Sequence, residues 1–149
     1  MYDRFYPGQV WLDTNGKRIQ AHGGSVLQVG DTFYWYGENK EFTDGSNGVW
    51  TWGVRCYRSK DLYNWEDCGV IIPPDLENEH SSLNPYTAML DRPHIIYNRF
   101  TKKFVCWMKV MRHDQTQMET VMTADHILGP YVLEVQDLRP LGMDAGDFD

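Results

Sequence analysis

The sequence is short of cysteine, of positive charge and of long apolar runs, and each shortage argues against a class of protein. Its three cysteines, Cys56, Cys68 and Cys106, are an odd number without CxxC spacing, so they predict neither a disulfide framework nor a zinc site. Lys and Arg total 14 against 21 Asp and Glu, which gives a formal net charge of −7. A surface of that sign repels phosphate backbones, so we expect no nucleic-acid partner.

The N-terminus "MYDRFYPGQV" has no basic stretch followed by an apolar core, and no apolar run reaches membrane-spanning length. The sequence also has no N-x-S/T acceptor site for glycosylation. We therefore expect no membrane partner. The expected location is the cytoplasm, unless an export signal was removed before this numbering begins.

Helical periodicity is nearly absent too, and short β-rich runs take its place, for example over 25–29, 32–37, 49–59, 94–97 and 104–110. Dipeptides such as Asn15-Gly16 and Gly30-Asp31 separate these runs and supply the chemistry of tight turns. Aromatic residues make up 14% of the chain, which suits a β-sheet core or a platform for the flat face of a sugar. The pattern predicts an all-β protein.

A long repeat organises the runs. The stretch "SVLQVGDTFYWYGE" is followed by "GVRCYRSKDLYNWEDCG", and later "HIIYNRFTKKFVCWMKV" is followed by "ETVMTADHILGPYVLEV". Tyr34 corresponds to Phe104, 70 residues on, and a four-stranded unit that recurs at such a distance is typical of a β-propeller blade. We predict one propeller domain over 1–149, with blade 1 at about 20–72, blade 2 at about 88–137 and the start of a third at about 140–149.

Four stretches, in order along the chain, carry a family resemblance: "AHGGSVLQVGDTFYWYGENK", "RSKDLYNWEDCG", "LDRPHIIYNRFTKKFVCWM" and "TADHILGPY". They resemble glycoside hydrolase family 43, above all its exo-β-1,3-galactanase-like branch, whose members carry AHGGG, YYWYGE, SSDLxNW, ERPKVIYN and SDxxxGPY. The resemblance covers the chain from about residue 10 to residue 149. It implies a five-bladed β-propeller with the substrate at the central axis. The chain would then be the N-terminal portion, an incomplete propeller of about two blades plus the start of a third.

The resemblance also implies inverting glycoside hydrolysis, in which one carboxylic acid protonates the leaving oxygen and a base activates water on the opposite side. Most members place that base directly after a His on the first inner strand. Here Gly23 follows His22, and glycine cannot accept a proton. The galactanase branch has the same gap. The general acid, a Glu on a later blade, would lie beyond Asp149.

Several residues match positions with a role in the family. Glu38 matches the Glu of WYGE and resembles a substrate-holding carboxylate. Asp91 stands where the branch has the Glu of ERP and is a candidate catalytic carboxylate, followed by Arg92 as a candidate substrate contact. Asp147, in "AGDFD", matches the Asp that tunes the pKa of the acid. Asp91 is one methylene shorter than the branch's Glu, which changes its reach.

Each of these residues also has a purely structural interpretation. Glu38 could be the solvated end of a hairpin, and Asp91 with Arg92 could form a local surface ion pair. His22 could bond only to backbone in a glycine turn, or else bind a sugar hydroxyl. Trp35 and Trp107 are candidates for stacking on a sugar, but aromatics at strand spacing are more often core.

We therefore expect a glycoside hydrolase-like protein that acts on β-linked plant-type polysaccharide or oligosaccharide derived from galactan, arabinan or xylan. One alternative is a non-catalytic carbohydrate-binding propeller, and another is an inactive truncated fragment. The chain alone should lack hydrolytic activity and should self-associate through open blade edges. We expect no required cofactor and no metal in the site, and leave open a structural calcium ion near the propeller axis.

Overall fold

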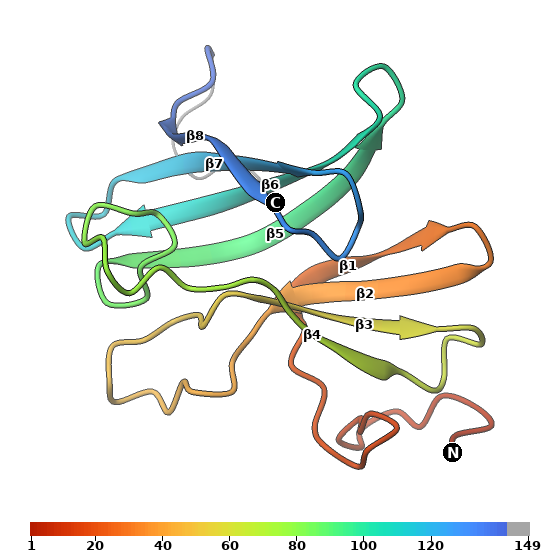
Figure 1. Cartoon of the computed structure of the whole chain (residues 1–149). Helices are drawn as coiled ribbons and strands as arrows, with labels where there is room; N and C mark the ends of the chain where they lie inside the picture. Colours follow the sequence, from red (N-terminus) through yellow and green to blue (C-terminus); the bar gives the residue numbers. More distant parts are fainter. Residues whose placement is uncertain (143–149) are drawn as a thin grey trace.

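The chain folds into eight β-strands, which form two four-stranded antiparallel sheets (Figure 1). The structure is a computed structural model and describes residues 1–142. Strands β1 (His22–Val29), β2 (Thr32–Glu38), β3 (Val54–Ser59) and β4 (Glu66–Ile72) form the first sheet, and β5 (Ala88–Asn98), β6 (Lys103–Arg112), β7 (Gln117–Ala124) and β8 (Val132–Leu138) form the second. Strand order follows chain order in both sheets. This meander confirms the predicted all-β class with two propeller-type blades. The predicted start of a third blade falls almost wholly outside the described residues.

The two sheets stack face to face, with the inner strand β5 lying against β1 and β2 (Figure 1). The Tyr36 hydroxyl joins them, because it accepts a hydrogen bond from the Ile95 N–H at 2.9 Å and donates one to the Ile95 carbonyl at 3.2 Å. Buried side chains from both sheets surround this contact: Val54, Cys56, Ile72, Leu90, Cys106, Met108 and Met122. The predicted inner strands near 25–29 and 94–97 are thereby confirmed.

Strand β6 shows how the second sheet divides its side chains. Phe104, Cys106, Met108 and Val110 are buried, whereas the alternating residues, among them Trp107 and Lys109, are only partly buried. Because successive side chains of a strand point to opposite faces, Trp107 and Lys109 share the face that looks away from the first sheet. That face carries one wall of the cleft described below.

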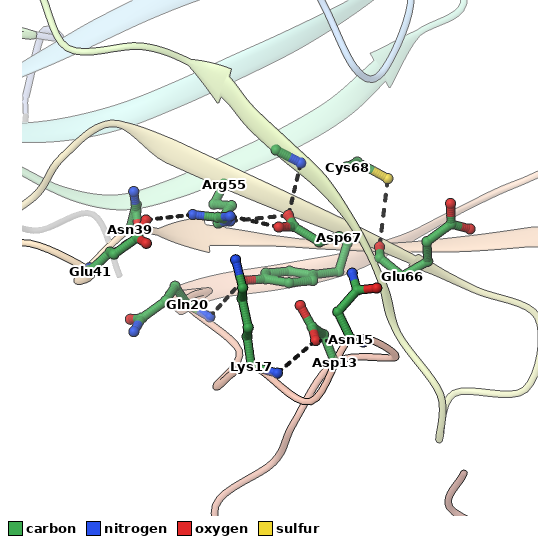
Figure 2. Close-up of polar contacts among 12 residues, drawn as sticks. Asp13, Asn15, Lys17, Gln20, Asn39, Glu41, Arg55, Glu66, Asp67 and Cys68 are labelled. Carbon is green, nitrogen blue, oxygen red and sulfur yellow. Dashed lines mark hydrogen bonds and ion pairs between the residues drawn. The ribbon is translucent and has the colours of Figure 1, made fainter.

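Polar contacts order the N-terminal segment and join it to the first sheet (Figure 2). The carboxylate of Asp13 accepts the N–H groups of Asn15 and Lys17 at 2.8 and 2.9 Å, and the Gln20 N–H donates to the Tyr57 hydroxyl at 2.9 Å. The Asp13 carboxylate is therefore used within a hairpin turn, which an isolated bridge between Leu12 and Arg18 closes.

Two strand boundaries differ from the sequence-based expectation. The β-rich run over 49–59 becomes a strand only from Val54, because Gly53 has a φ of 77° and the chain turns there. Strand β5 begins earlier than the run over 94–97, at Ala88, and includes an irregularity next to Pro93.

The cysteines are free thiols, and burial raises the pKa of Cys56 and of Cys106. Residues 1–142 contain no helix long and apolar enough to cross a membrane.

Candidate functional site

Both inner strands carry a β-bulge at equivalent positions. The register of β1 shifts between His22 and Ser25, and that of β5 shifts between Asp91 and His94. Within these bulges Gly23 has a φ of 59° and Arg92 a φ of 47°. A positive φ is easy for glycine but costs a residue such as arginine about 1–3 kcal/mol. Bulges redirect side chains and recur beside functional sites, so these two mark a candidate site where the inner strands meet.

Glu38 lies between the two bulges, at the end of β2 and opposite His22. Its side chain is fully buried. The Arg92 N–H donates to Glu38 Oε1 at 3.0 Å, while the Lys40 ammonium lies 2.5 Å and His22 Nδ1 lies 3.4 Å from Oε2. Glu38 is therefore not a solvated hairpin end. The bulge of the second sheet supplies one of its partners, so the carboxyl bridges the blades.

Three glycines make room for this carboxyl. A Cβ at Gly23 would stand 2.5 Å from Glu38 Oε1. A Cβ at Gly24 would overlap the carbonyl of Tyr36, and one at Gly37 would overlap the backbone of Ala21. The segment before β1 and the end of β2 thus approach too closely for any side chain at these positions. The carboxyl of Glu38 occupies the space into which a residue at position 23 would extend.

Glu38 and Asp91 form a hydrogen-bonded carboxyl pair. Burial raises the pKa of Glu38, and the bond to Asp91 raises it further against the effect of Lys40. Burial would also raise the pKa of Asp91, but the bond from Glu38 and the nearby charges of Arg92 and Lys109 lower it overall. Two carboxyls that share a site separate their pKa values in this way. Of the two carboxyls, Glu38 therefore has the raised pKa and Asp91 the lowered pKa.

Arg92, the residue after Asp91, lines an open cleft of about 510 Å³. The cleft is lined by residues 23–25 of β1, by residues 92–94 and Ile96 of β5, by Trp107 and Lys109 of β6, and by Glu119 of β7. A second open cleft, of about 790 Å³, lies on the other side of Gly23 and is lined by His22, Lys40 and Trp35 among others. Gly23 belongs to both clefts, so the openings meet beside Glu38. An indole wall with charged groups around it suits a sugar ring.

No protein-family model matches the sequence, and no curated protein matches it. Solved structures do. A family 43 β-1,3-galactosidase is 36% identical over 94% of this chain, with a TM-score of 0.79. An exo-β-1,3-galactanase from Phanerochaete chrysosporium, solved with galactose, is 35% identical over 92% of this chain, with a TM-score of 0.79. An exo-β-1,3-galactanase from Clostridium thermocellum is 36% identical over 89%, with a TM-score of 0.71.

The chain belongs to glycoside hydrolase family 43. It spans only 29%, 30% and 27% of the length of these three solved proteins. The family membership and the incomplete propeller that the sequence predicts are thus confirmed.

Four of the family 43 site residues predicted from the sequence come together in this fold: His22, Glu38, Asp91 and Arg92. Arg92 Nε lies 3.8 Å from Asp91 Oδ2, so the expected local ion pair is present as well as the contact with Glu38. Their roles in binding or catalysis stay predictions. Asp147 lies outside the described residues.

The two predicted stacking residues lie on different faces. Trp107 lines the cleft of about 510 Å³ beside Lys109. Trp35 lies on the opposite face of its sheet from Tyr36 and Glu38, with ring centroids 5.2 Å from Trp11 and 5.3 Å from Trp65. Alternation along β2 makes this unavoidable, because Trp35 and Tyr36 are neighbours. Trp35 therefore packs on the other face of the sheet from the carboxyl pair, and it lines the cleft of about 790 Å³. Its stacking on a sugar stays a prediction.

Sequence reasoning did not select two charged residues that belong to the site. Lys40 pairs with Glu38, donates to the Trp50 carbonyl at 2.7 Å and lies 3.8 Å from the centre of the Trp50 ring. Glu119 lies in β7 with only 3% of its surface exposed, and burial raises its pKa to about 7 although Lys109 lowers it. A lone Glu within the run "QMETVM" was the available signal. Among residues 1–142 no group of three or more His, Cys, Asp or Glu could hold a metal ion.

Proposed function

We propose that this chain supplies part of the sugar-binding site of an inverting glycoside hydrolase that acts on β-1,3-linked galactan or its oligosaccharides. The observation that carries the proposal is the Glu38–Asp91 carboxyl pair, set in the glycine cradle where the two inner strands bulge. The relatives support the substrate class, because their names describe β-1,3-galactosidases and exo-β-1,3-galactanases.

The pair binds substrate in this proposal and does not perform both halves of the acid–base chemistry. An inverting hydrolase separates its acid and base by about 6.5–9.5 Å, so that a water molecule and the bond to be cleaved fit between them. Glu38 and Asp91 are hydrogen-bonded to one another and cannot flank a sugar in that way. Asp91, whose pKa is lowered, is suited to accept hydrogen bonds from sugar hydroxyls, and Glu38 orients it.

The neighbours of the pair complete a sugar site. Arg92 and Trp107 line the cleft of about 510 Å³, and His22, at 65% side-chain exposure, lines the adjoining cleft of about 790 Å³. Position 23 supplies no base, because glycine has no side chain and Glu38 fills the adjoining space. A general acid and a base would have to come from beyond the described residues.

A second candidate function is carbohydrate binding without hydrolysis. The specific observation in its favour is the same crowding at Gly23, which excludes a base from the position that most of the family uses. Both candidates require Asp91 for sugar binding, and they differ in whether glycosidic bonds are cleaved.

The test combines binding and turnover on the purified chain. Calorimetry with β-1,3-galactobiose should show weak binding that Asp91→Asn reduces by about tenfold, the usual effect of losing a hydrogen bond to a charged group. Asp125→Asn is the matched control. Asp125 is exposed and pairs with Lys103, the first residue of β6, which does not line the cleft. Hydrolysis of β-1,3-galactan, aryl β-galactosides, arabinosides or xylosides is expected to be absent. Turnover by the purified chain would show that it builds a full catalytic site, and undetectable binding of all these sugars would overturn the proposal.

A further inference from the structure

Three charged residues form one row across the second sheet. Asp91 of β5 is paired with Lys109 of β6, which is paired in turn with Glu119 of β7. Directly opposed residues of antiparallel strands share a face and have Cβ atoms about 4.5–5.5 Å apart. Lys109 thus stands in the row between two carboxyl-bearing residues. Lys109 and Glu119 line the cleft, and Asp91 carries the row to Glu38.

The equivalent row of the first sheet shows what is unusual here. His22 and Asp91 each stand directly before a bulge, 69 residues apart in the chain. The row that begins at His22 continues to Glu38 and then to Val54, which is completely buried. Glu119 occupies in the second sheet the place of that valine. A blade can therefore be built with an apolar residue there, and a carboxyl in that place needs another explanation.

A buried carboxyl is costly unless a partner compensates its charge. Among residues 1–142, the charged or titratable groups that share its row or its cleft are Lys109 of β6 and Asp91, Arg92 and His94 of β5. From the other directions β8 presents Leu138, and β1 presents residues 23–25. Lys109 is the neighbour whose charge lowers the pKa of Glu119, and it also lowers the pKa of Asp91. One cation thus serves two carboxyls.

We infer that Lys109 and Glu119 are positioning residues for Asp91. Asp91 and Glu119 share the charge of Lys109, so the protonation state of Glu119 affects how the sugar-binding carboxylate of Asp91 is held. When Glu119 carries a proton, the charge of Lys109 compensates Asp91 alone. When Glu119 ionises, Lys109 is shared, and Asp91 is oriented less firmly. The part of this inference that concerns sugar rests on the proposed function, and the coupling within the row does not.

The first experiment measures the coupling without any sugar. Carboxyl carbons of Asp and Glu are titrated by NMR in the whole chain. Lys109→Met should move the midpoints of Glu119 and Asp91 upward together, because a cation near both is lost. Glu119→Gln should leave the Asp91 midpoint nearly unchanged, because Glu119 is already protonated where Asp91 titrates. It should abolish the second step that Asp91 shows when Glu119 titrates. Lys109→Arg keeps the charge and should leave both midpoints near the wild-type values.

Lys103→Met is the matched control, because Lys103 lies on the same strand but is exposed and pairs with Asp125. It should move neither midpoint, since the solvent screens charges that far apart. The inference is overturned if Lys109→Met leaves both midpoints in place, or if Lys103→Met shifts them equally.

The second experiment measures the affinity for β-1,3-galactobiose from pH 5 to pH 9. The wild-type affinity should fall by about threefold as Glu119 ionises, a fraction of one hydrogen bond, and Glu119→Gln should remove that step. Coupled titrations without sugar binding would support the row and refute the proposed function. Sugar binding with uncoupled titrations, or with an unchanged pH profile in Glu119→Gln, would overturn this inference and leave the proposed function standing.

Discussion

The carboxyl oxygen Oε1 of Glu38 lies 2.5 Å from the point that a Cβ of Gly23 would occupy. The two residues come from neighbouring strands, and the bulge in β1 brings them together. Glycine at position 23 is therefore a steric requirement of this site. The missing base and the buried carboxyl are two consequences of the same packing.

The first prediction isolates that packing. Gly23→Ala should cost clearly more folding free energy than Gly30→Ala, by about 1–3 kcal/mol, the usual cost of forcing atoms into a filled site. The comparison is well matched, because φ is 59° at Gly23 and 61° at Gly30, while a Cβ at Gly30 meets nothing within 4 Å. Urea unfolding of both variants gives the difference. Equal costs would mean that Glu38 moves aside freely.

A second prediction concerns Glu38 itself. Glu38→Ala should reduce the free energy of unfolding by about 3 kcal/mol, since it leaves a cavity and removes the partner of the buried Arg92 N–H. Glu38→Gln keeps an acceptor for that N–H and a donor for Asp91, so it should cost less than half as much. Thermal unfolding of the two variants checks this, with Glu41→Ala as a largely exposed control. A Gln variant as unstable as the Ala variant would contradict the hydrogen-bonded carboxyl pair.

The pH dependence of stability provides a third prediction. The pKa of Glu119 is raised in the folded chain to about 7. A raised pKa contributes stability below the pKa of the unfolded chain, and that contribution is lost as the pH rises through about 7. Between pH 5 and pH 8 the wild type should therefore lose roughly 2 kcal/mol relative to Glu119→Gln.

Urea unfolding of both proteins at the two pH values measures this loss. Glu134→Gln, on the exposed strand β8, serves as the control and should follow the wild type. If the difference in free energy of unfolding between wild type and Glu119→Gln is the same at both pH values, Glu119 is ionised, and its charge well compensated, from pH 5 to pH 8.

A fourth prediction separates the two tryptophans. Trp107→Ala should weaken binding of β-1,3-galactobiose by about tenfold with a modest loss of stability, because Trp107 lines the cleft. Trp35→Ala should lower the free energy of unfolding by about 3–5 kcal/mol and leave the affinity of the folded protein nearly unchanged, because Trp35 packs between Trp11 and Trp65. Calorimetry gives the affinity of each variant, and urea unfolding gives its free energy of unfolding. Loss of affinity in the folded Trp35 variant would return that residue to the sugar site.

Local pattern made much of the fold predictable. Alternating apolar residues and turn dipeptides indicated the strands, and the repeat indicated two blades. Glu38 and Asp91 could be selected because each stands at a strand position that the family resemblance marks. Their hydrogen bond could not be predicted, since it depends on how closely the two sheets stack.

The remaining features depend on distances across the fold. Lys40 and Glu119 have no distinguishing local pattern, and their importance follows from burial beside other charges. The positive φ of Arg92, directly before a proline, runs against local preference, and the contact with Glu38 accompanies it. The face on which Trp107 meets the cleft follows from register, whereas the cleft itself follows from the stacking of the blades.

The Tyr36 hydroxyl forms hydrogen bonds to both the N–H and the carbonyl of Ile95 and so fixes the alignment of the two blades. A slide of one sheet along the other by a single residue, about 3.3 Å, would break both bonds at once. The same slide would carry the Arg92 N–H away from Glu38. Alignment of the blades along their strands therefore also assembles the carboxyl pair. A chain whose sheets dock one residue out of register would form its core but not its site.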